Sequence, residues 1–419
     1  MTTQEYIRLH ADDDVRQLAL RGAKEEGVDL SFALDQIRGR QVARVKIPSW
    51  AAIDGIIYPP HLSMEQCSSE PTARYKAAVL SRVAGDNSNG ESRLVDLTGG
   101  FGVDFSFMAR GFSDVVYVER NQNLCELATN NMPLLGLDAT IVNADGTDYL
   151  RTMPSADVVF LDPARRDGHG GRTYALADCT PNVLEMLPLL MQKARTIVLK
   201  LSPMLDWRKA VRDLSAREES DGYGHKQNVE VHIVSVRNEC KELVIVLSMD
   251  TESKPLHMVC ANLLAGQSGQ GDEIFEFDVS QQPFTESAEP CTVSTTPMYL
   301  YEPNASIMKA GSYDVLCQRY GVRAIARNSH LFVADNHIGN FPGRAFRVLS
   351  SCTMNKKEVR RMLSGIVQAN ISVRNFPLSA EGLRRKLKLK DGGTKYLFAT
   401  TTADGAHLLL LTERLCKAL

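Results

Sequence analysis

The chain has 419 residues, of which 44% are hydrophobic and 23% charged, a composition that fits a globular protein with two to four domains rather than one. It has no run of 18 apolar residues and no signal-peptide pattern at its start, so we expect a cytoplasmic protein without a membrane span. Its nine cysteines are scattered without a C-x-x-C pair, which predicts reduced thiols and no metal site.

Residues 1–88 are predicted to be an N-terminal helical region. Apolar residues recur at helical spacing from Leu30 to Val45 and again from Pro71 to Val83. We favour helices that pack against the following domain. The alternative is that Ser68-Ser69-Glu70 and Tyr75-Lys76 reach a cofactor or substrate.

A glycine-rich turn follows the first predicted strand, Arg93 to Thr98, and a helix is expected from Val103 to Arg110. Glycines at positions 99, 100 and 102 allow the backbone to approach a ligand at distances where a Cβ atom would clash. Asp96 precedes this turn and Asp104 follows it, so the turn is flanked by two carboxylates.

Three later predicted strands end in acids. The strand at residues 114–119 ends at Glu119, the third precedes Asn143-Ala144-Asp145, and the fourth, residues 156–161, precedes Asp162. Each strand is aliphatic and is followed by a helical stretch, which is typical of a parallel, doubly wound α/β sheet. Ligands of such sheets bind outside the carboxyl ends of the strands, where these acids fall.

Two features distinguish this loop from a dinucleotide-binding loop of the form G-x-G-x-x-G or A. The third small residue is replaced by Phe105. The last two strands, Val229 to Val236 and Leu243 to Ser248, are separated only by Arg237 to Glu242. That connection is too short for a parallel crossover, so it predicts a β-hairpin that closes the sheet.

Five βα units followed by a hairpin, with these acids, resemble a class I S-adenosylmethionine-dependent methyltransferase. The resemblance covers residues 89–252 and implies a Rossmann-like, seven-stranded sheet with S-adenosyl-L-methionine as cofactor. It places Asp96 to Gly102 along the methionine part of the cofactor, Glu119 at the ribose and Asp145 at the adenine amino group. The implied cofactor-binding residues are Asp96, Thr98, Gly99, Gly100, Gly102, Asp104, Glu119, Arg120, Ala144, Asp145 and Asp162.

The turn Asp162-Pro163-Ala164-Arg165 is the expected methyl-transfer site, with Asp162, Pro163 and Arg165 as catalytic residues. Enzymes that methylate an exocyclic amine carry Asp or Asn, Pro, Pro and an aromatic ring there, and the ring stacks on a flipped base. Here the fourth position is Arg165, whose guanidinium can also stack on a base. The mobile loop expected over the site is Gly168-His169-Gly170-Gly171-Arg172.

The same turn also resembles that of RNA 5-methyluridine methyltransferases, which use a cysteine nucleophile after the next strand. This chain has Lys200-Leu201-Ser202-Pro203 at that point, without a cysteine. A covalent adduct at carbon 5 therefore loses its nucleophile, and direct in-line transfer remains.

The last third of the chain is predicted to hold a small α+β insert at 253–335 and a basic domain at 336–419. From Arg344 to Lys395 there are thirteen Lys or Arg residues and three acids, a net charge of +10. Because the whole chain has a formal charge of −2, the remainder carries about −12. A basic module on an acidic catalytic body predicts a polyanionic substrate.

The pattern after residue 336 is β-α-β-α-β-β, with two helices that have basic outer faces. It resembles the THUMP-like domain at the end of a bacterial family of methyltransferases, and true THUMP domains bind RNA. The expected RNA-binding residues are Arg360, Arg361, Arg384, Arg385 and Lys386. The alternative is an ordinary solvated surface.

We therefore expect a methyltransferase that modifies a base nitrogen of RNA, either tRNA or rRNA. One alternative is a methyltransferase that acts on protein or a small molecule, and another is a non-catalytic RNA-binding protein that retains the cofactor fold. The series Asp96, Gly100, Gly102, Glu119 and Asp145 argues against the latter. The sequence leaves the oligomeric state open.

Overall fold

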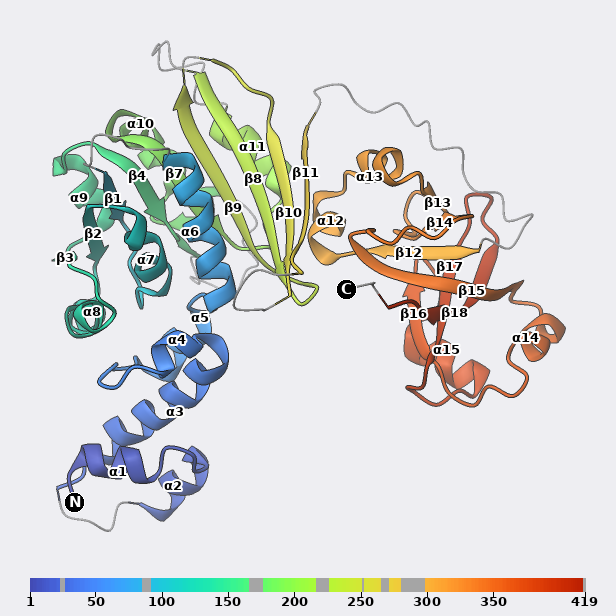
Figure 1. Ribbon diagram of the computed structural model, residues 1–419, viewed down its shortest axis with the longest axis horizontal. Coiled ribbons are helices and arrows are strands. Elements are labelled where there is room, and N and C mark those ends of the chain that lie inside the picture. The colour runs from blue at the N-terminus through green and yellow to red at the C-terminus, as the bar shows by residue number, and fades with distance from the viewer. Residues whose placement is uncertain are drawn as a thin grey trace. The chain divides into compact units, whose positions relative to one another are not determined.

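The computed structural model describes residues 1–22, 27–84, 92–165, 176–215, 226–250, 252–264, 271–279 and 298–416 (Figure 1). The chain forms two compact units. The first comprises mainly Met1–Val236 and Lys241–His257, and the second comprises Arg237–Cys240, Met258–Leu264 and Gly271–Leu419. No described helix combines the length and apolar composition that crossing a bilayer requires.

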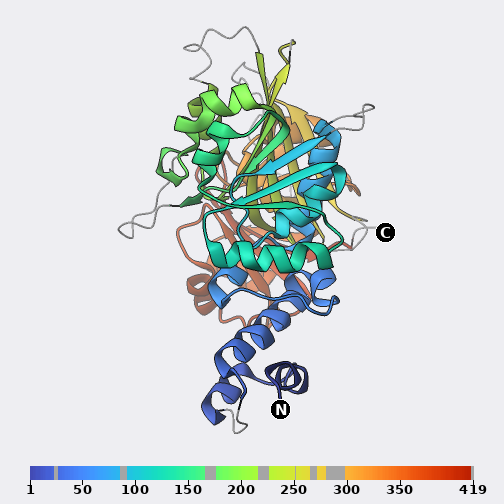
Figure 2. The same ribbon diagram turned by 90° about the vertical axis from the view of Figure 1, so that its left-hand side faces the viewer.

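The first unit begins with six helices, and α1 to α3 lie at one end of it, away from the sheet (Figures 1 and 2). They are α1 (Thr3–Leu9), α2 (Val15–Arg21), α3 (Leu30–Lys46), α4 (Pro48–Ala51), α5 (His61–Gln66) and α6 (Glu70–Ala84). Side chains of Thr2, Asp14 and Asp29 cap the first three helices by accepting hydrogen bonds from backbone N–H groups. A small apolar core that includes Tyr6, Leu18 and Ile37 joins these three helices.

The sheet of the first unit has the predicted βα order. Its strands are β1 (Arg93–Asp96), β2 (Asp114–Glu119), β3 (Thr140–Asn143), β4 (Ala156–Leu161), β7 (Ala194–Leu201), β8 (Lys226–Val236) and β9 (Glu239–Asp250). Strands β3, β2, β1, β4 and β7 are parallel, whereas β9 is antiparallel to β7. The predicted hairpin joins β8 to β9 through Arg237 and Asn238, both at positive φ (49° and 65°). Such φ values suit a tight hairpin turn.

The hydrogen-bonding order of the whole sheet is β11-β10-β8-β9-β7-β4-β1-β2-β3. The seven expected strands thus share it with β10 (His257–Leu263) and β11 (Glu273–Asp278), whose residues from Met258 onward are counted with the second unit. Its helical connections are α7 (Val103–Met108), α8 (Gln122–Leu134), α9 (Gly146–Thr152), α10 (Val183–Lys193) and α11 (Trp207–Ser215). Short elements are the 3-10 helices η1 (Ala109–Gly111) and η2 (Leu176–Asp178) and the two-residue strands β5 (Ala164–Arg165) and β6 (Cys179–Thr180). Helix α6 packs on α7, β4 and β8.

The second unit contains a mixed sheet in the order β13-β14-β12-β15-β18-β17-β16. Its strands are β12 (Tyr299–Pro303), β13 (Arg323–Ala324), β14 (Phe332–Ala334), β15 (Gly343–Thr353), β16 (Asn370–Arg374), β17 (Lys395–Thr401) and β18 (His407–Arg414). Its helices are α12 (Ala305–Ala310), α13 (Tyr313–Tyr320), α14 (Lys356–Met362) and α15 (Ala380–Leu387). From β15 onward this order is the β-α-β-α-β-β pattern expected from the sequence.

Residues of β17 and β18 alternate between two apolar cores, as neighbouring side chains on a strand point to opposite faces. Phe398 and Leu410 belong to one core, and Leu397 and Leu409 belong to the other. The second core also contains Val359 and Met362 of α14 and Leu383 and Leu387 of α15. Helices α14 and α15 therefore cover the same face of the sheet and turn their polar sides outward together.

Candidate active site

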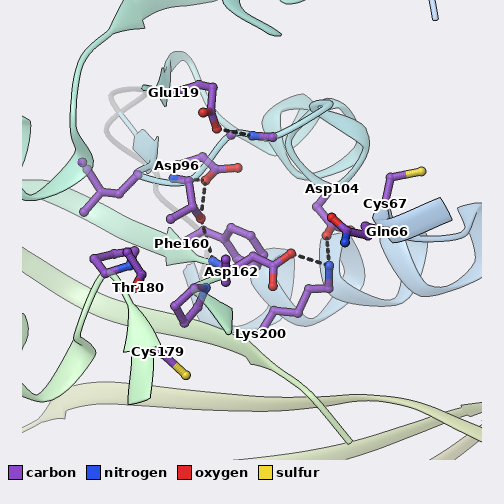
Figure 3. A pocket seen from close by; sticks show the side chains of 18 of the residues that line it. Gln66, Cys67, Asp96, Asp104, Glu119, Phe160, Asp162, Cys179, Thr180 and Lys200 are labelled. Carbon is purple, nitrogen blue, oxygen red and sulfur yellow. Dashed lines mark hydrogen bonds and ion pairs between the residues drawn. The ribbon is translucent and has the colours of Figure 1, made fainter. Parts of the chain in front are cut away.

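A pocket of about 980 Å³ opens at the carboxyl ends of β1, β2, β4 and β7, where a parallel sheet binds its ligands (Figure 3). The sequence-predicted residues from Asp96 to Gly102, with Asp104, Glu119, Arg120, Asp145, Asp162 and Pro163, line it. The structure thus brings together in one cavity residues that lie up to 67 positions apart in the sequence. Ala144 lies beside it, where its N–H donates to the Glu119 carbonyl at 3.2 Å.

Thr98 connects Asp96, at the end of β1, to Asp162, which follows β4. The Asp96 carboxylate accepts hydrogen bonds from the Thr98 backbone N–H at 2.9 Å and from its hydroxyl at 3.4 Å. The same hydroxyl accepts a 2.6 Å hydrogen bond from the Asp162 backbone N–H. Asp96 is only 1% exposed, and its burial, together with nearby Asp104, Asp162 and Glu119, raises its pKa to about 8.

Two loop glycines are required, Gly99 by its close contact with a ring and Gly102 mainly by its backbone conformation. A Cβ atom at position 99 would lie 2.2 Å from the Tyr117 ring, and one at position 102 would lie 2.4 Å from the Met132 methyl group. Gly102 also has a φ of +84°, which disfavours other residues. Phe105, which replaces the third small residue of dinucleotide loops, is fully buried edge-on against Tyr117. The ring that argued against a dinucleotide site therefore packs beneath the loop.

Glu119 is fixed by two backbone groups. Its Oε2 accepts from the Gly100 N–H at 2.9 Å and its Oε1 accepts from the Asn121 N–H at 2.8 Å. Asp145 is exposed and caps α9 by accepting from the Thr147 N–H. The adjacent Gly146 is not among the sequence-predicted residues, yet a Cβ there would lie 2.2 Å from the Leu97 carbonyl oxygen. The Asp145-Gly dipeptide is the sequence signal that could have indicated it.

Below the loop, two buried lysines and three carboxylates form a group that we call the ion network: Lys76, Lys200, Asp104, Asp162 and Glu242. The Lys76 side chain is wholly buried, with its Nζ 3.1 Å from Asp104 and also bonded to Glu242. The Ser68 hydroxyl lies 2.7 Å from Asp104 Oδ2 and 3.1 Å from Glu242 Oε1. Lys200 Nζ lies 2.6 Å from Asp162 and 3.3 Å from Asp104.

Both lysines influence the carboxylates of the ion network. Burial raises the pKa of Asp104, but Lys76 and Lys200 outweigh it and hold that pKa below its ordinary value. For Asp162, burial outweighs the effect of Lys200, so its pKa is raised. Lys200 has a pKa well above the ordinary lysine value because Asp162 and Asp104 overcome its own burial. Lys200 is therefore a cation at neutral pH.

Three prolines line the pocket, at positions 163, 181 and 203. The backbone of the Asp162-Pro163-Ala164-Arg165 turn pairs with β6, Ala164 with Thr180 and Arg165 with Cys179. The Arg165 side chain and residues 166–175, including the loop predicted at 168–172, lie outside the described residues. Of the described lining residues, only Phe101 and Phe160 are aromatic, and both are buried.

The segment from α5 to the start of α6 contributes directly to the pocket, but of the residues named in the alternative sequence interpretation only Ser68 is among its described lining residues. Ser63, Glu65, Gln66, Cys67 and Ser68 line it. Burial raises the pKa of the Cys67 thiol, so that thiol is not an activated nucleophile. The sequence signal for Lys76 is a charged residue on the apolar stripe of α6, beside the buried Ala73 and Leu80.

The predicted RNA-binding residues lie on α14 and α15 of the second unit. Of its thirteen basic residues between 344 and 395, five form ion pairs: Arg344, Arg347, Arg374, Arg384 and Lys395. The other eight are exposed and have no acid partner among the described residues: Lys356, Lys357, Arg360, Arg361, Arg385, Lys386, Lys388 and Lys390. We call these eight the basic face. Arg384 differs because it pairs with Asp391 at 2.5 Å.

Comparison with known proteins agrees with this geometry. A crystal structure described as a "putative methyltransferase from Porphyromonas gingivalis W83" matches 98% of this chain and 97% of its own, with 30% identity and a TM-score of 0.80. The chain belongs to this methyltransferase family. Family models match residues 299–342 as a ferredoxin-like domain and residues 343–414 as a THUMP domain-like region.

Other solved structures that match this chain are less similar to it. A SAM-dependent methyltransferase from Agrobacterium tumefaciens covers 42% of this chain and 61% of its own, at 18% identity and a TM-score of 0.32. No curated protein matches the chain.

The enzyme is an S-adenosylmethionine-dependent methyltransferase, and its pocket suits that cofactor. Glycines at positions 99 and 146 let the pocket-lining backbone pack directly on the Tyr117 ring and on the Leu97 carbonyl, where a Cβ atom would clash. Carboxylates at positions 96, 119, 145 and 162 line the same cavity. Such a set can accept hydrogen bonds from hydroxyl and amino groups and attracts a sulfonium cation.

Proposed function

We propose that this methyltransferase transfers a methyl group to a base nitrogen of RNA, either tRNA or rRNA. The observation that carries the choice of RNA is the basic face. Eight exposed cations, six on α14 and α15 and two just after α15, are not neutralised by described acids of their own unit. Phosphates bind at such surfaces because each contact releases counterions. Four of the five predicted RNA-binding residues belong to this face: Arg360, Arg361, Arg385 and Lys386. The fifth, Arg384, also lies on α15 but is paired with Asp391.

Within the pocket, we assign the cofactor to the glycine loop and the acids beside it. Asp96, Thr98, Gly99, Gly100 and Gly102 would surround its methionine part, with Asp162 at the other side of the Thr98 hydroxyl. Glu119, whose orientation is fixed by two backbone N–H groups, would hold the ribose, and Arg120, Ala144 and Asp145 would border the adenine. Asp104 contributes indirectly, because its carboxylate is bonded within the ion network.

When bound, S-adenosylmethionine supplies a methyl group on a sulfonium sulfur. The acceptor nitrogen uses its lone pair to bond the methyl carbon, while the carbon–sulfur bond breaks with its electrons left on sulfur. The nitrogen then releases one proton to solvent. Asp162 would orient the acceptor by accepting its N–H hydrogen bonds, and Pro163 would confine the base. The backbone of Arg165, the third predicted catalytic residue, pairs with Cys179 of the pocket lining.

The choice of nitrogen rests on the charge at Asp162. A carboxylate accepts hydrogen bonds and stabilises the positive charge that a neutral nitrogen acquires during transfer. The stretch Lys200-Leu201-Ser202-Pro203, where carbon-5 enzymes carry their nucleophile, offers no cysteine. The two cysteines that do line the pocket, Cys67 and Cys179, lie on other elements, at the end of α5 and on β6. Direct transfer to nitrogen is therefore the reaction that this site supports best.

The test is tritiated methyl transfer to bulk cellular RNA, followed by digestion to nucleosides. We expect labelled RNA with the wild type and a loss of roughly 100-fold or more with Asp162→Ala. Asp148→Ala, at a 69% exposed acid of α9 outside the pocket, should retain full activity. Label in protein or small molecules with none in RNA would overturn the proposal, and label on base carbon would overturn the choice of nitrogen.

A further inference from the structure

Lys200 occupies an unusual place among the charges of the pocket. It is the second-last residue of β7, and its side chain is 11% exposed. Its ammonium group points at Asp162 and at Asp104, as the close view shows (Figure 3). The sequence motifs assign it no function, because the expected methyl-transfer turn ends at Arg165 and the segment after β7 is notable only for lacking a cysteine.

We propose that Lys200 is a positioning residue for methyl transfer. It holds the Asp162 carboxylate ionised and in one orientation, so that the site selects an acceptor with N–H donors and rejects an anionic oxygen or sulfur acceptor. This inference rests on the proposed function and adds to it the residue that controls acceptor chemistry.

The ion network contains more negative than positive charge, and the burial of its members shows which residue exposes the difference. Lys76 and Lys200 carry two positive charges, and Asp104, Asp162 and Glu242 carry three negative charges. Four members have side chains that are at most 11% exposed, whereas the Asp162 side chain is 40% exposed. One net negative charge therefore remains, and Asp162 presents it to the pocket.

Each group that faces Lys200 comes from a different element. Asp162 follows β4, Asp104 belongs to α7, Lys76 to α6 and Glu242 to β9. Because Lys76 and Ser68 bond Asp104 from one side, that carboxylate stays fixed, and Lys200 lies between this anchored acid and Asp162, whose carboxylate is bonded to Lys200 itself. A lysine held in this way contributes orientation as well as charge.

The protonation states also exclude other roles. A lysine with a pKa well above the ordinary value stays protonated and cannot serve as the general base. Burial raises the pKa of Asp162, as do Asp104 and Glu242, while Lys200 lowers it. Without Lys200 the raising effects are unopposed, so Asp162 would take up a proton at higher pH and lose its ability to accept from both amine hydrogens.

The experiment compares the wild type with Lys200→Met, Lys200→Arg and the exposed control Lys209→Met on α11. The first readout is the pH titration of the Asp162 carboxyl carbon by NMR, assigned with Asp162→Asn. We expect Lys200→Met to move this titration to higher pH, and Lys200→Arg and Lys209→Met to keep it near the wild-type position. An unchanged titration in Lys200→Met overturns the inference.

The second readout is methyl transfer to RNA across pH 6 to 9. For Lys200→Met we expect kcat roughly 100-fold lower at pH 7, with cofactor Kd and RNA KM within about threefold of wild type. Its activity should recover as pH rises, because Asp162 ionises again, and Lys200→Arg should restore most of the activity. A proportionate loss of cofactor binding, or a loss independent of pH, would indicate a merely structural role and overturn the inference.

Two controls separate the possible failures. If the wild type labels no RNA, the proposed function fails, while the NMR titration still decides the role of Lys200. If Lys200→Met does not fold, the wild type provides the check through the nitrogen-15 signal of Lys200 Nζ. That signal must stay protonated to about pH 10, close to the ordinary lysine pKa, and deprotonation below about pH 9 overturns the inference.

Discussion

The ion network and the basic face use positive charge in opposite ways. In the ion network, Lys76 and Lys200 are buried and each contacts at least two carboxylates. On the basic face, residues such as Arg360 and Arg385 are exposed and have no acid partner among the described residues. The paired cations fix the geometry of acids, whereas the unpaired ones remain available to an anionic ligand.

The physical reason is the surrounding medium. Charges excluded from water interact strongly and are screened little by salt, but they are costly to leave without a partner. Exposed charges are screened over a Debye length of about 10 Å at 0.1 M salt. Mutations in the ion network should therefore affect stability and catalysis at any salt concentration, and mutations on the basic face should affect salt-dependent binding alone.

The largest effect is expected from Lys76→Met. This change leaves the buried carboxylates of Asp104 and Glu242 without their cation, which should lower the free energy of unfolding by about 3–5 kcal/mol. Urea unfolding monitored by circular dichroism measures it. Arg82→Met is the control, since Arg82 is on the same helix and 53% exposed in its pair with Glu230, and should cost no more than about 1 kcal/mol. Equal costs would contradict the contrast.

A smaller effect, confined to binding, is expected when four cations of the basic face are removed together in Arg360→Ala, Arg361→Ala, Arg385→Ala and Lys386→Ala. We assume that each cation contacts one phosphate of single-stranded RNA. The factor by which RNA affinity falls between 50 and 200 mM salt should then be roughly 50 times smaller in the variant than in the wild type. Filter binding across this salt range measures it, and unfolding should be unchanged.

The matched control for that variant replaces four exposed arginines of the N-terminal helices with alanine, at Arg8, Arg16, Arg21 and Arg38. It changes the net charge equally. An equal fall in RNA affinity would show that overall charge, and not the basic face, governs binding.

Gly146→Ala should weaken cofactor binding by roughly tenfold, because its Cβ would meet the Leu97 carbonyl oxygen at the edge of the pocket. Isothermal titration with S-adenosylhomocysteine measures this change. Gly111→Ala places a Cβ at an ordinary 3.6 Å from the Ser81 hydroxyl and should bind normally. Unaltered binding by Gly146→Ala would show that the pocket tolerates a methyl group there.

The smallest predicted difference lies between two neighbours on α15. Arg385→Ala should weaken RNA binding several-fold and reduce the salt slope by about 0.7, the value for one phosphate contact on a single strand. Arg384→Ala should have less effect, because Asp391 already neutralises that guanidinium. The reverse order in the same binding assay would show that ion pairing does not decide which arginine contacts RNA.

The catalytic fold can be predicted from sequence because its signals are local. Each strand is a short aliphatic run, and the acids Asp96, Glu119 and Asp162 stand directly at strand ends. The topology of a parallel sheet then brings strand ends to one edge without further information. The hairpin likewise follows from the length of one connection. For these reasons the amino-acid sequence alone suffices to recognise the family resemblance and the class of enzyme.

The ion network cannot be predicted in the same way because it depends on contacts between distant residues. Lys76 and Glu242 are 166 positions apart, and although the sequence indicates Lys76 as a residue that could reach the site, nothing in it pairs Lys76 with Glu242. Lys200 stands on a recognisable strand, but which acids it meets depends on where the fold places α7 and its Asp104. Asp104 lines the pocket, but no sequence pattern indicates that its carboxylate is bonded to two lysines. Similarly, the pairing of Arg384 with Asp391 requires a turn whose geometry the sequence does not specify.

The burial of Lys76 has a consequence for how this protein can be dissected. Helix α6 ends only a few residues before β1, and a designer of a minimal catalytic fragment would be inclined to cut the chain between them. Such a fragment would lose the lysine that fills the space beside Asp104 and Glu242, and with it the Ser68 hydroxyl. Helix α6 is therefore a structural part of the catalytic domain. A fragment that lacks it should need the helix added back as a peptide.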